Sequence, residues 1–221
     1  MPTIIFDFDS SLISCESLEK LQEKHYTAEN GMLEKVSSLT NQGMSGEIPF
    51  SESLRSRLEL LPPHKEEVLS FAKEAINYLT EEIADCIKSL QKEHQCEIWI
   101  ISGGLQEILQ VVGEELGISA DRIHGVQLLW NEDGTYQGID PNDPFSISKY
   151  LGAKTLSPLW SGPKIMIGDG MTDYELYAKN LTDHFIAFTE HIARPALLAK
   201  NCLEAKNVFQ LQRIIKECLC E

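Results

Sequence analysis

The 221-residue sequence is poor in basic side chains, and it lacks several patterns that would assign it to a particular class of protein. It has 19 Lys and Arg against 34 Asp and Glu, which gives a formal net charge of −15. This balance argues against nucleic acid or an anionic membrane as a main partner, because both attract basic patches. No apolar run approaches the ~20 residues that a membrane-spanning helix requires. The sequence therefore predicts a soluble protein that binds no membrane.

Cysteine and histidine patterns typical of metal or disulfide sites are also missing. The six cysteines include no CxxC pair, and the histidines have no metal-ligand spacing. Because no secretory signal precedes the first apolar segment, we expect free thiols in a reducing, cytoplasmic location. Hydrophobic residues make up 43% of the chain and charged residues 24%, as in ordinary globular proteins. The sequence gives no indication of an oligomeric state.

The first apolar segment leads directly into two aspartates. Thr3-Ile4-Ile5-Phe6 reads as a buried strand, and Asp7 and Asp9 follow it, one residue apart. If the backbone stays extended through Phe8, both carboxylates emerge on one side at the strand's carboxyl end. Two neighbouring carboxylates repel each other unless a cation or a shared proton compensates. This stretch is therefore either a candidate catalytic or cation-binding segment or a simple turn after a strand.

A long helical block follows this strand. Helical patterns cover residues 16–25, 28–39, 49–60 and 65–79. The block is too long for a simple crossover between neighbouring strands. We therefore predict that residues 15–79 form a small helical cap, inserted into a core domain made of residues 1–14 and 80–221.

From Thr80 onwards, strand patterns alternate with helical ones. Strands are predicted at residues 97–101, 164–167 and 184–188, a hairpin at 124–139, and helices at 80–93, 105–116, 145–156 and 208–218. Alternation of this kind predicts the α/β class, with a Rossmann-like parallel sheet and helices on both of its faces.

Three of the predicted strands end in polar or glycine-rich turns. The turns begin at Asp7, Ser102 and Gly168, and the last contains Asp169 and Asp173. Ligands of parallel α/β sheets bind at the carboxyl ends of the strands, so these residues are expected to converge. Clustered carboxylates favour a hard cation with oxygen ligands, best matched by Mg²⁺. We expect Ser102 to lie where a helix begins, a position that suits a phosphate group.

These motifs together resemble the haloacid dehalogenase superfamily of aspartyl-phosphate phosphatases. Its four motifs match Asp7-Phe8-Asp9-Ser10-Ser11, Ser102, Lys149 and Gly168-Asp169-Gly170-Met171-Thr172-Asp173, in the family's order. Ser11 departs from the more common threonine. Lys154 competes with Lys149 as the third motif, whereas Lys164 opens a strand at its far end.

The resemblance implies a set of catalytic roles. Asp7 would be the nucleophile and Asp9 the general acid and base. Ser102 and Lys149 would assist at the phosphoryl group, with Gly103, Gly104 and Thr172 among the substrate-binding residues. Asp7, the backbone carbonyl of Asp9, and Asp169 would hold Mg²⁺, and Asp173 would orient them without binding the metal itself.

Within that superfamily the chain resembles the phosphoserine phosphatase subgroup. Glu16 lies nine residues after Asp7, where the subgroup carries a glutamate for the substrate ammonium, and Met44, Phe50 and Arg57 match its cap. Arg57 would hold the substrate carboxylate, while Met44 and Phe50 would cover the site. This implies a small phosphomonoester substrate, O-phosphoserine.

Two other functions remain open at this point. One keeps the chemistry with a different small phosphomonoester, such as phosphohomoserine or phosphocholine, or transfers the phosphoryl group to an alcohol. The other is a non-catalytic module that binds a phosphorylated ligand. The intact set of Asp7, Asp9, Ser102 and Asp169 argues against the second, because loss of the nucleophile is the simplest way to abandon catalysis.

Overall fold

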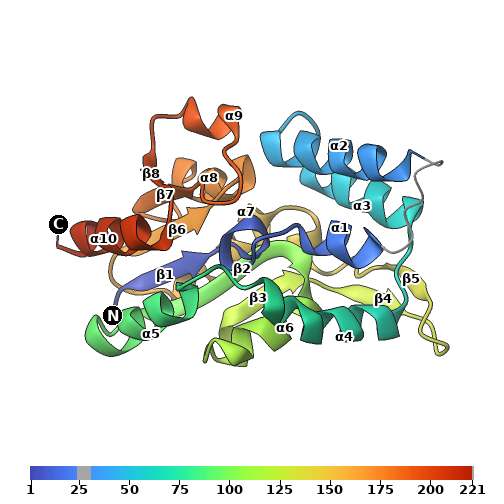
Figure 1. Ribbon diagram of the computed structural model, residues 1–221, viewed down its shortest axis with the longest axis horizontal. Helices are drawn as coiled ribbons and strands as arrows, with labels where there is room; N and C mark the ends of the chain where they lie inside the picture. The colour runs from blue at the N-terminus through green and yellow to red at the C-terminus, as the bar shows by residue number, and fades with distance from the viewer. Residues whose placement is uncertain (24–30, 221) are drawn as a thin grey trace.

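A six-stranded parallel sheet forms the centre of the protein in the computed structural model, which describes residues 1–23 and 31–220 (Figure 1). In the order β3-β2-β1-β6-β7-β8, its strands are Ile123–Val126, Glu97–Leu105, Thr3–Phe6, Lys164–Gly168, His184–Phe188 and Leu203–Ala205. Every pairing is parallel. All four residues of β1 are buried, as a central strand covered on both faces requires. The predicted α/β class is confirmed.

Helices cover both faces of this sheet. One face carries α5 (Ile83–Glu93), α6 (Gln106–Glu115) and α10 (Val208–Leu219), and the other carries α7 (Lys149–Leu156) and α8 (Met171–Ala178). The buried side of α5 is Ile83, Cys86, Ile87 and Leu90, which recur at helical spacing. A short helix, α9 (Pro195–Leu198), lies between β7 and β8. No helix among the described residues is long and apolar enough to cross a membrane.

Among its described residues, the segment between β1 and α5 contains four α-helices: α1 (Ser17–Gln22), α2 (Met32–Ser45), α3 (Phe50–Leu60) and α4 (Lys65–Glu74). Helices α2 and α3 pack against each other so closely that a Cβ on Gly43 would lie 2.8 Å from Ser53 Cβ. In contrast, α4 packs against α6 of the core. The end of the predicted helix 16–25 and the beginning of the predicted helix 28–39 overlap residues 24–30, which lie outside the described residues.

The backbone departs from several details predicted at the element ends. Strand β1 ends at Phe6, and Phe8–Leu12 form a turn closed by a hydrogen bond from the Ile13 N–H to the Phe8 carbonyl at 3.1 Å, with Ser10 at a φ of 53°. Helix α5 begins at Ile83, three residues later than predicted. The predicted helix 145–156 is divided into a 3₁₀ turn at Pro144–Ser146 and α7. Strand β8 was not predicted, because its three residues offer too short a pattern.

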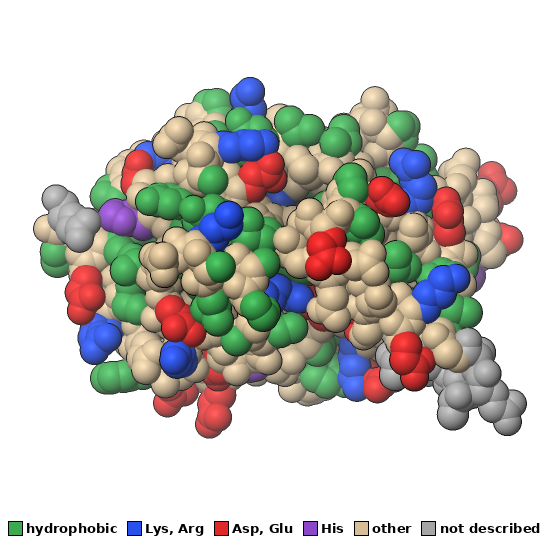
Figure 2. All heavy atoms as spheres, turned by 90° about the horizontal axis from the view of Figure 1, so that it is seen from above, with side chains coloured by type: hydrophobic (Ala, Val, Ile, Leu, Met, Phe, Trp, Pro, Cys, Tyr) green, Lys and Arg blue, Asp and Glu red, His purple; other side chains and the backbone are tan. Residues whose placement is uncertain are grey.

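The remaining predicted elements are present. Strands β4 (Leu128–Trp130) and β5 (Tyr136–Ile139) form a hairpin within the predicted range 124–139, with Gly134 at a φ of 83° in its turn, whereas β3 at the start of that range pairs with β2 in the main sheet. None of the six cysteines, all of which the structure describes, forms a disulfide. On the face seen in Figure 2, acidic and basic side chains are interspersed and form no continuous basic patch.

Candidate active site

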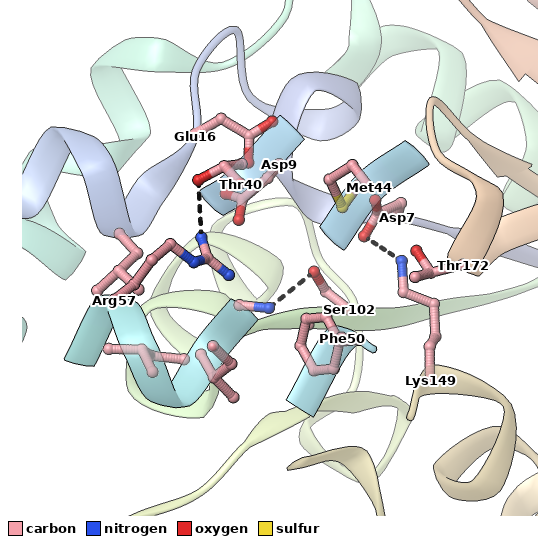
Figure 3. Close-up of a pocket in the computed structure, with 15 residues that line it drawn as sticks. Asp7, Asp9, Glu16, Thr40, Met44, Phe50, Arg57, Ser102, Lys149 and Thr172 are labelled. Carbon is pink, nitrogen blue, oxygen red and sulfur yellow. Dashed lines mark hydrogen bonds and ion pairs between the residues drawn. The ribbon is translucent and has the colours of Figure 1, made fainter. Parts of the chain in front are cut away.

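The strand order brings the predicted motifs together. Because β1 lies between β2 and β6, the carboxyl ends of these three strands are adjacent. A pocket at this edge is lined by Asp7, Asp9, Glu16, Leu18, Thr40, Met44, Phe50, Leu54, Arg57, Ser102, Gly103, Gly104, Leu105, Lys149 and Thr172 (Figure 3). Every residue predicted to act on or bind the substrate is therefore at one pocket. Asp169 and Asp173 lie beside it, next to Asp7.

Asp7 is a buried carboxylate held by two donors. Its Oδ1 accepts a hydrogen bond from the Phe8 N–H at 2.7 Å and lies 2.7 Å from Lys149 Nζ. Lys149 also contacts Asp173 Oδ1 and is only 3% exposed. Burial by itself lowers the pKa of Lys149, but Asp173 and Asp7 outweigh it and raise the pKa above its ordinary value. Lys149 is thus a charged ammonium directed at the candidate nucleophile, whereas Lys154 is exposed.

Asp9 lies across the pocket from Lys149 and differs in its environment. Its Oδ1 accepts a hydrogen bond from the Ser17 N–H at 2.9 Å, at the start of α1. Burial raises the pKa of Asp9 to about 8, and the negative charges of Glu16 and Asp7 contribute to this rise. A carboxyl group that keeps its proton near neutral pH can donate it to a leaving oxygen.

Asp7, Asp169 and Asp173 form an acidic cluster in which one oxygen from each lies within 4.8 Å of the others. The Asp169 Oδ1 atom is buried and has no hydrogen-bond partner among the described residues. Burial raises the pKa of Asp169 well above its ordinary value, Glu16 adds to this, and Arg194 opposes it. An orphaned buried carboxylate oxygen beside a second carboxylate fits a hard divalent cation such as Mg²⁺.

Asp173 has both of its oxygens in use. Oδ1 contacts Lys149, and Oδ2 accepts the Gly170 N–H at 2.9 Å. Burial and Asp7 raise the pKa of Asp173 to about 7, against the opposing effect of Lys149. Because its oxygens are engaged with the chain, Asp173 can hold Lys149 and the turn after β6 in place.

Ser102 is not at the start of a helix, which corrects the prediction. Strand β2 continues through Gly103 and Gly104 to Leu105, which pairs with Val126, and α6 begins only at Gln106. The apolar run that indicated the strand ends at Ile101, so its continuation had no hydrophobic signal. Ser102 Oγ accepts the Gly104 N–H at 3.1 Å and faces the pocket.

Gly103 is where the helical segment above the site touches the core. A Cβ on Gly103 would lie 2.6 Å from Cε2 and Cζ of Phe50, the first residue of α3. Likewise a Cβ on Gly170 would lie 2.6 Å from Met44 Cε. Met44 and Phe50 therefore rest directly on core glycines, and the pocket is covered.

On the phosphomonoester substrates that the sequence resemblance implies, we expect Gly103→Ala to lower kcat/KM by about 10²-fold, because the added methyl displaces Phe50 and misaligns the covered site. The melting temperature should change little, since Gly103 does not require a positive φ. Steady-state kinetics and thermal melts measure both effects. Adding Phe50→Leu should restore part of the loss, whereas an unchanged kcat/KM in the single variant would show that this contact is unimportant.

Glu16 and Arg57 face the same end of the pocket. Arg57 is 7% exposed because it shares the buried side of α3 with Ser53, Leu54 and Leu58. Its Nη1 donates to Thr40 Oγ1 at 3.2 Å. Burial raises the pKa of Glu16, and the positive charges of Arg194 and Arg57 act in the opposite direction. A carboxylate and a guanidinium near each other provide complementary partners for a zwitterion.

Arg194 is a site residue that the sequence analysis missed. It is 6% exposed and lies in the loop after β7, where its Nε is 2.8 Å from Asp169 Oδ2 and its Nη2 is 3.1 Å from Glu16 Oε1. Its position in the loop after a predicted strand was a weak signal, because the loops at the carboxyl ends of parallel strands lie at the ligand-binding edge. No residue pattern distinguished this arginine from a surface charge.

The chain is similar to known hydrolases of one family. The family model of haloacid dehalogenase-like hydrolases matches residues 4–178. Phosphoserine phosphatase of Homo sapiens is 33% identical over 194 residues, which cover 86% of this chain and 83% of that protein. A phosphoserine phosphohydrolase-like protein from Francisella tularensis has a solved structure with a TM-score of 0.93 and 38% identity, covering 97% of this chain and 100% of that one.

A more distant solved structure shares the fold. It is a phospho-aspartyl intermediate analogue of phosphoserine phosphatase, with a TM-score of 0.78 at 24% identity, covering 97% of each chain. The family match spans β1 to α8 and includes all four motifs. The chain therefore belongs to the haloacid dehalogenase-like hydrolase family.

Proposed function

We propose that this protein is a Mg²⁺-dependent phosphomonoesterase that hydrolyses O-phosphoserine to serine and phosphate through an aspartyl-phosphate. One observation carries the proposal. A single covered pocket has a phosphoryl-transfer set, Asp7, Asp9 and Lys149, and, in the same pocket, a carboxylate and a guanidinium, Glu16 and Arg57. The relatives named phosphoserine phosphatase support the same substrate.

The pocket's own residues account for the phosphoryl transfer. An oxygen of Asp7 attacks phosphorus while the bond from phosphorus to the serine oxygen breaks, and Asp9 gives its proton to that oxygen. Asp9 then takes a proton from a water molecule, whose oxygen attacks phosphorus and releases phosphate from Asp7. Lys149, whose Nζ lies 2.7 Å from Asp7 Oδ1, offsets phosphoryl charge. Ser102 Oγ and the backbone amides near Gly103 and Gly104 would donate hydrogen bonds to the phosphoryl oxygens.

The metal site fits this chemistry. Asp7 and Asp169 would hold Mg²⁺ with their carboxylates, and the backbone carbonyl of Asp9 would complete the protein's share of the ligands. When bound, Mg²⁺ neutralises charge where the carboxylate nucleophile and the phosphoryl group meet. Asp173 would orient Lys149 and the turn after β6.

The other end of the pocket suits an amino acid. Arg57 would bind the substrate carboxylate by two parallel hydrogen bonds, and Glu16 would accept from its ammonium. Met44, Phe50 and Thr172 would close the site over the bound substrate. We propose that the covering part of the cap, assigned to residues 15–79, is α1 to α3, since α4 packs against the core.

One observation favours a second candidate with the same chemistry. Glu16 Oε1 already accepts from Ser10 Oγ at 3.0 Å and from Arg194 Nη2 at 3.1 Å. A Glu16 carboxylate that is partly neutralised within the protein would be compatible with another small phosphomonoester or with phosphoryl transfer to an alcohol. Phosphohomoserine and phosphocholine are examples of such substrates.

A phosphate-release screen tests the proposal. The purified protein with Mg²⁺ should release phosphate from O-phosphoserine with a higher kcat/KM than from phosphothreonine, phosphocholine or sugar phosphates. Chelation with EDTA should remove the activity, and added Mg²⁺ should restore it. A higher kcat/KM on any small phosphomonoester other than O-phosphoserine would favour the second candidate, and no turnover of any phosphomonoester would contradict both.

A further inference from the structure

Arg194 is a buried cation whose three nitrogens are all used, each on a different part of the site. Nε donates to Asp169 Oδ2 at 2.8 Å, Nη2 to Glu16 Oε1 at 3.1 Å, and Nη1 to Asn41 Oδ1 of α2 at 3.1 Å. Burying a guanidinium is costly unless it is paired and hydrogen-bonded, and here both conditions hold. The side chain thus joins the acidic cluster, the pocket and the helix above it.

The contact with Asp169 determines how that carboxylate can be used. Arg194 occupies Oδ2, and Oδ1 is left buried without a hydrogen-bond partner among the described residues. A carboxylate pinned through one oxygen presents the other in a fixed direction. Hydrogen-bonded partners of this kind orient metal-binding carboxylates in many proteins.

The backbone of Arg194 is itself held firmly. It is the N-terminal cap of α9, where its carbonyl accepts from Leu197 at 3.0 Å and Leu198 at 3.1 Å. Earlier in the same loop, His191 Nε2 lies 2.8 Å from Thr80 Oγ1, which donates to the Ser11 carbonyl at 2.8 Å. The loop between β7 and α9 is therefore tied to the segment that follows Asp7, and the guanidinium is pre-positioned.

We propose that Arg194 is a positioning residue shared by the metal site and the substrate site. It directs Asp169 Oδ1 toward the metal ion, sets the orientation of Glu16, and through Asn41 connects both to the cap helix α2. The identities of the metal and the substrate rest on the proposed function. A merely structural role, as a link between α2 and the core, would instead affect stability alone.

Calorimetric titration of the metal-free protein with Mg²⁺, without substrate, tests the metal part. Arg194→Gln should weaken Mg²⁺ binding by about 10- to 100-fold, the range typical of lost partners of metal ligands. Arg194→Lys should recover only part of the affinity, because an ammonium keeps the charge but not the planar fork. The matched control is Arg122→Gln, which removes a 3.1 Å ion pair with Glu97 outside the site and should leave Mg²⁺ binding unchanged.

Asn41→Ala separates positioning from the structural link. This variant removes the contact to α2 but keeps those to Asp169 and Glu16, so its Mg²⁺ affinity should stay near the wild-type value. At saturating Mg²⁺, Arg194→Gln should raise KM for O-phosphoserine about tenfold while changing KM for p-nitrophenyl phosphate much less, since only the former places an ammonium at Glu16.

The outcomes distinguish the two proposals. Wild-type Mg²⁺ affinity in Arg194→Gln, or an equal loss in Asn41→Ala, overturns the role of Arg194 whatever the substrate is. Loss of Mg²⁺ affinity in Arg194→Gln, together with no turnover of O-phosphoserine by the wild type, supports the metal part and contradicts the proposed substrate. A wild-type chain that binds no Mg²⁺ overturns both.

Discussion

Asp7→Asn is expected to lower kcat for every phosphomonoester by roughly 10⁵-fold, the scale seen when a catalytic nucleophile is removed. The amide is almost the same size as the carboxylate, and its oxygen can still accept the Phe8 N–H. It lacks the negative charge that attacks phosphorus and that pairs with Lys149. The variant should therefore fold and remain inactive.

The matched control is Asp183→Asn. Asp183 also pairs with a lysine, Lys164 at 2.9 Å, but at the opposite end of β6 from the pocket. Its loss should leave kcat unchanged. Melting temperatures of both variants confirm folding. Residual Asp7→Asn activity of more than a few per cent of the wild type would exclude Asp7 as the nucleophile.

Loss of activity alone does not distinguish a nucleophile from a metal ligand, so a second measurement is needed. When the wild type is mixed with O-phosphoserine that carries a radiolabelled phosphoryl group and is then quenched in acid, the label should appear on a peptide that contains Asp7. Asp7→Asn should retain no label even at saturating Mg²⁺. Labelling of a different peptide in the wild type would assign the nucleophile elsewhere.

Sequence patterns predicted the parts of the site that directly follow apolar strands. Asp7 and Asp169 come just after buried runs, and the order of parallel strands then makes them neighbours. The position of Ser102 relative to α6 was wrong because β2 continues through two glycines that have no side chains to reveal burial. Hydrophobic periodicity thus located the edge of the sheet better than the details of each turn.

Residues held by tertiary contacts were harder to predict. Spacing favoured Lys149 over Lys154 but left Lys154 possible, and only the start of α7 after its cap, Ser148, directs Lys149 into the core. Arg194 was missed because nothing local separates a buried arginine from a solvated one. Its importance follows from three partners far away in the sequence, which only the folded chain brings to it.

Arg57→Ala is expected to raise KM for O-phosphoserine by about 10²-fold, because truncating one partner of a buried, hydrogen-bonded charge pair costs 2–5 kcal/mol or more, of the order of 10²-fold. KM for p-nitrophenyl phosphate and for O-phosphoethanolamine should change far less, since neither has a carboxylate for Arg57 to bind. For Arg57→Lys, KM for O-phosphoserine should lie between those of the wild type and Arg57→Ala, because lysine keeps the charge but loses the two-pronged geometry.

Arg55→Ala provides the matched control for this variant. Arg55 lies two residues earlier on α3 but is exposed, whereas Arg57 is on the buried side of the helix at the pocket. Its replacement should leave KM for all three substrates unchanged. Equal losses of Arg57→Ala on substrates with and without a carboxylate would mean that Arg57 supports the cap through Thr40 and does not recognise the amino acid. Selective loss on O-phosphoserine would identify the carboxylate as the group that Arg57 binds.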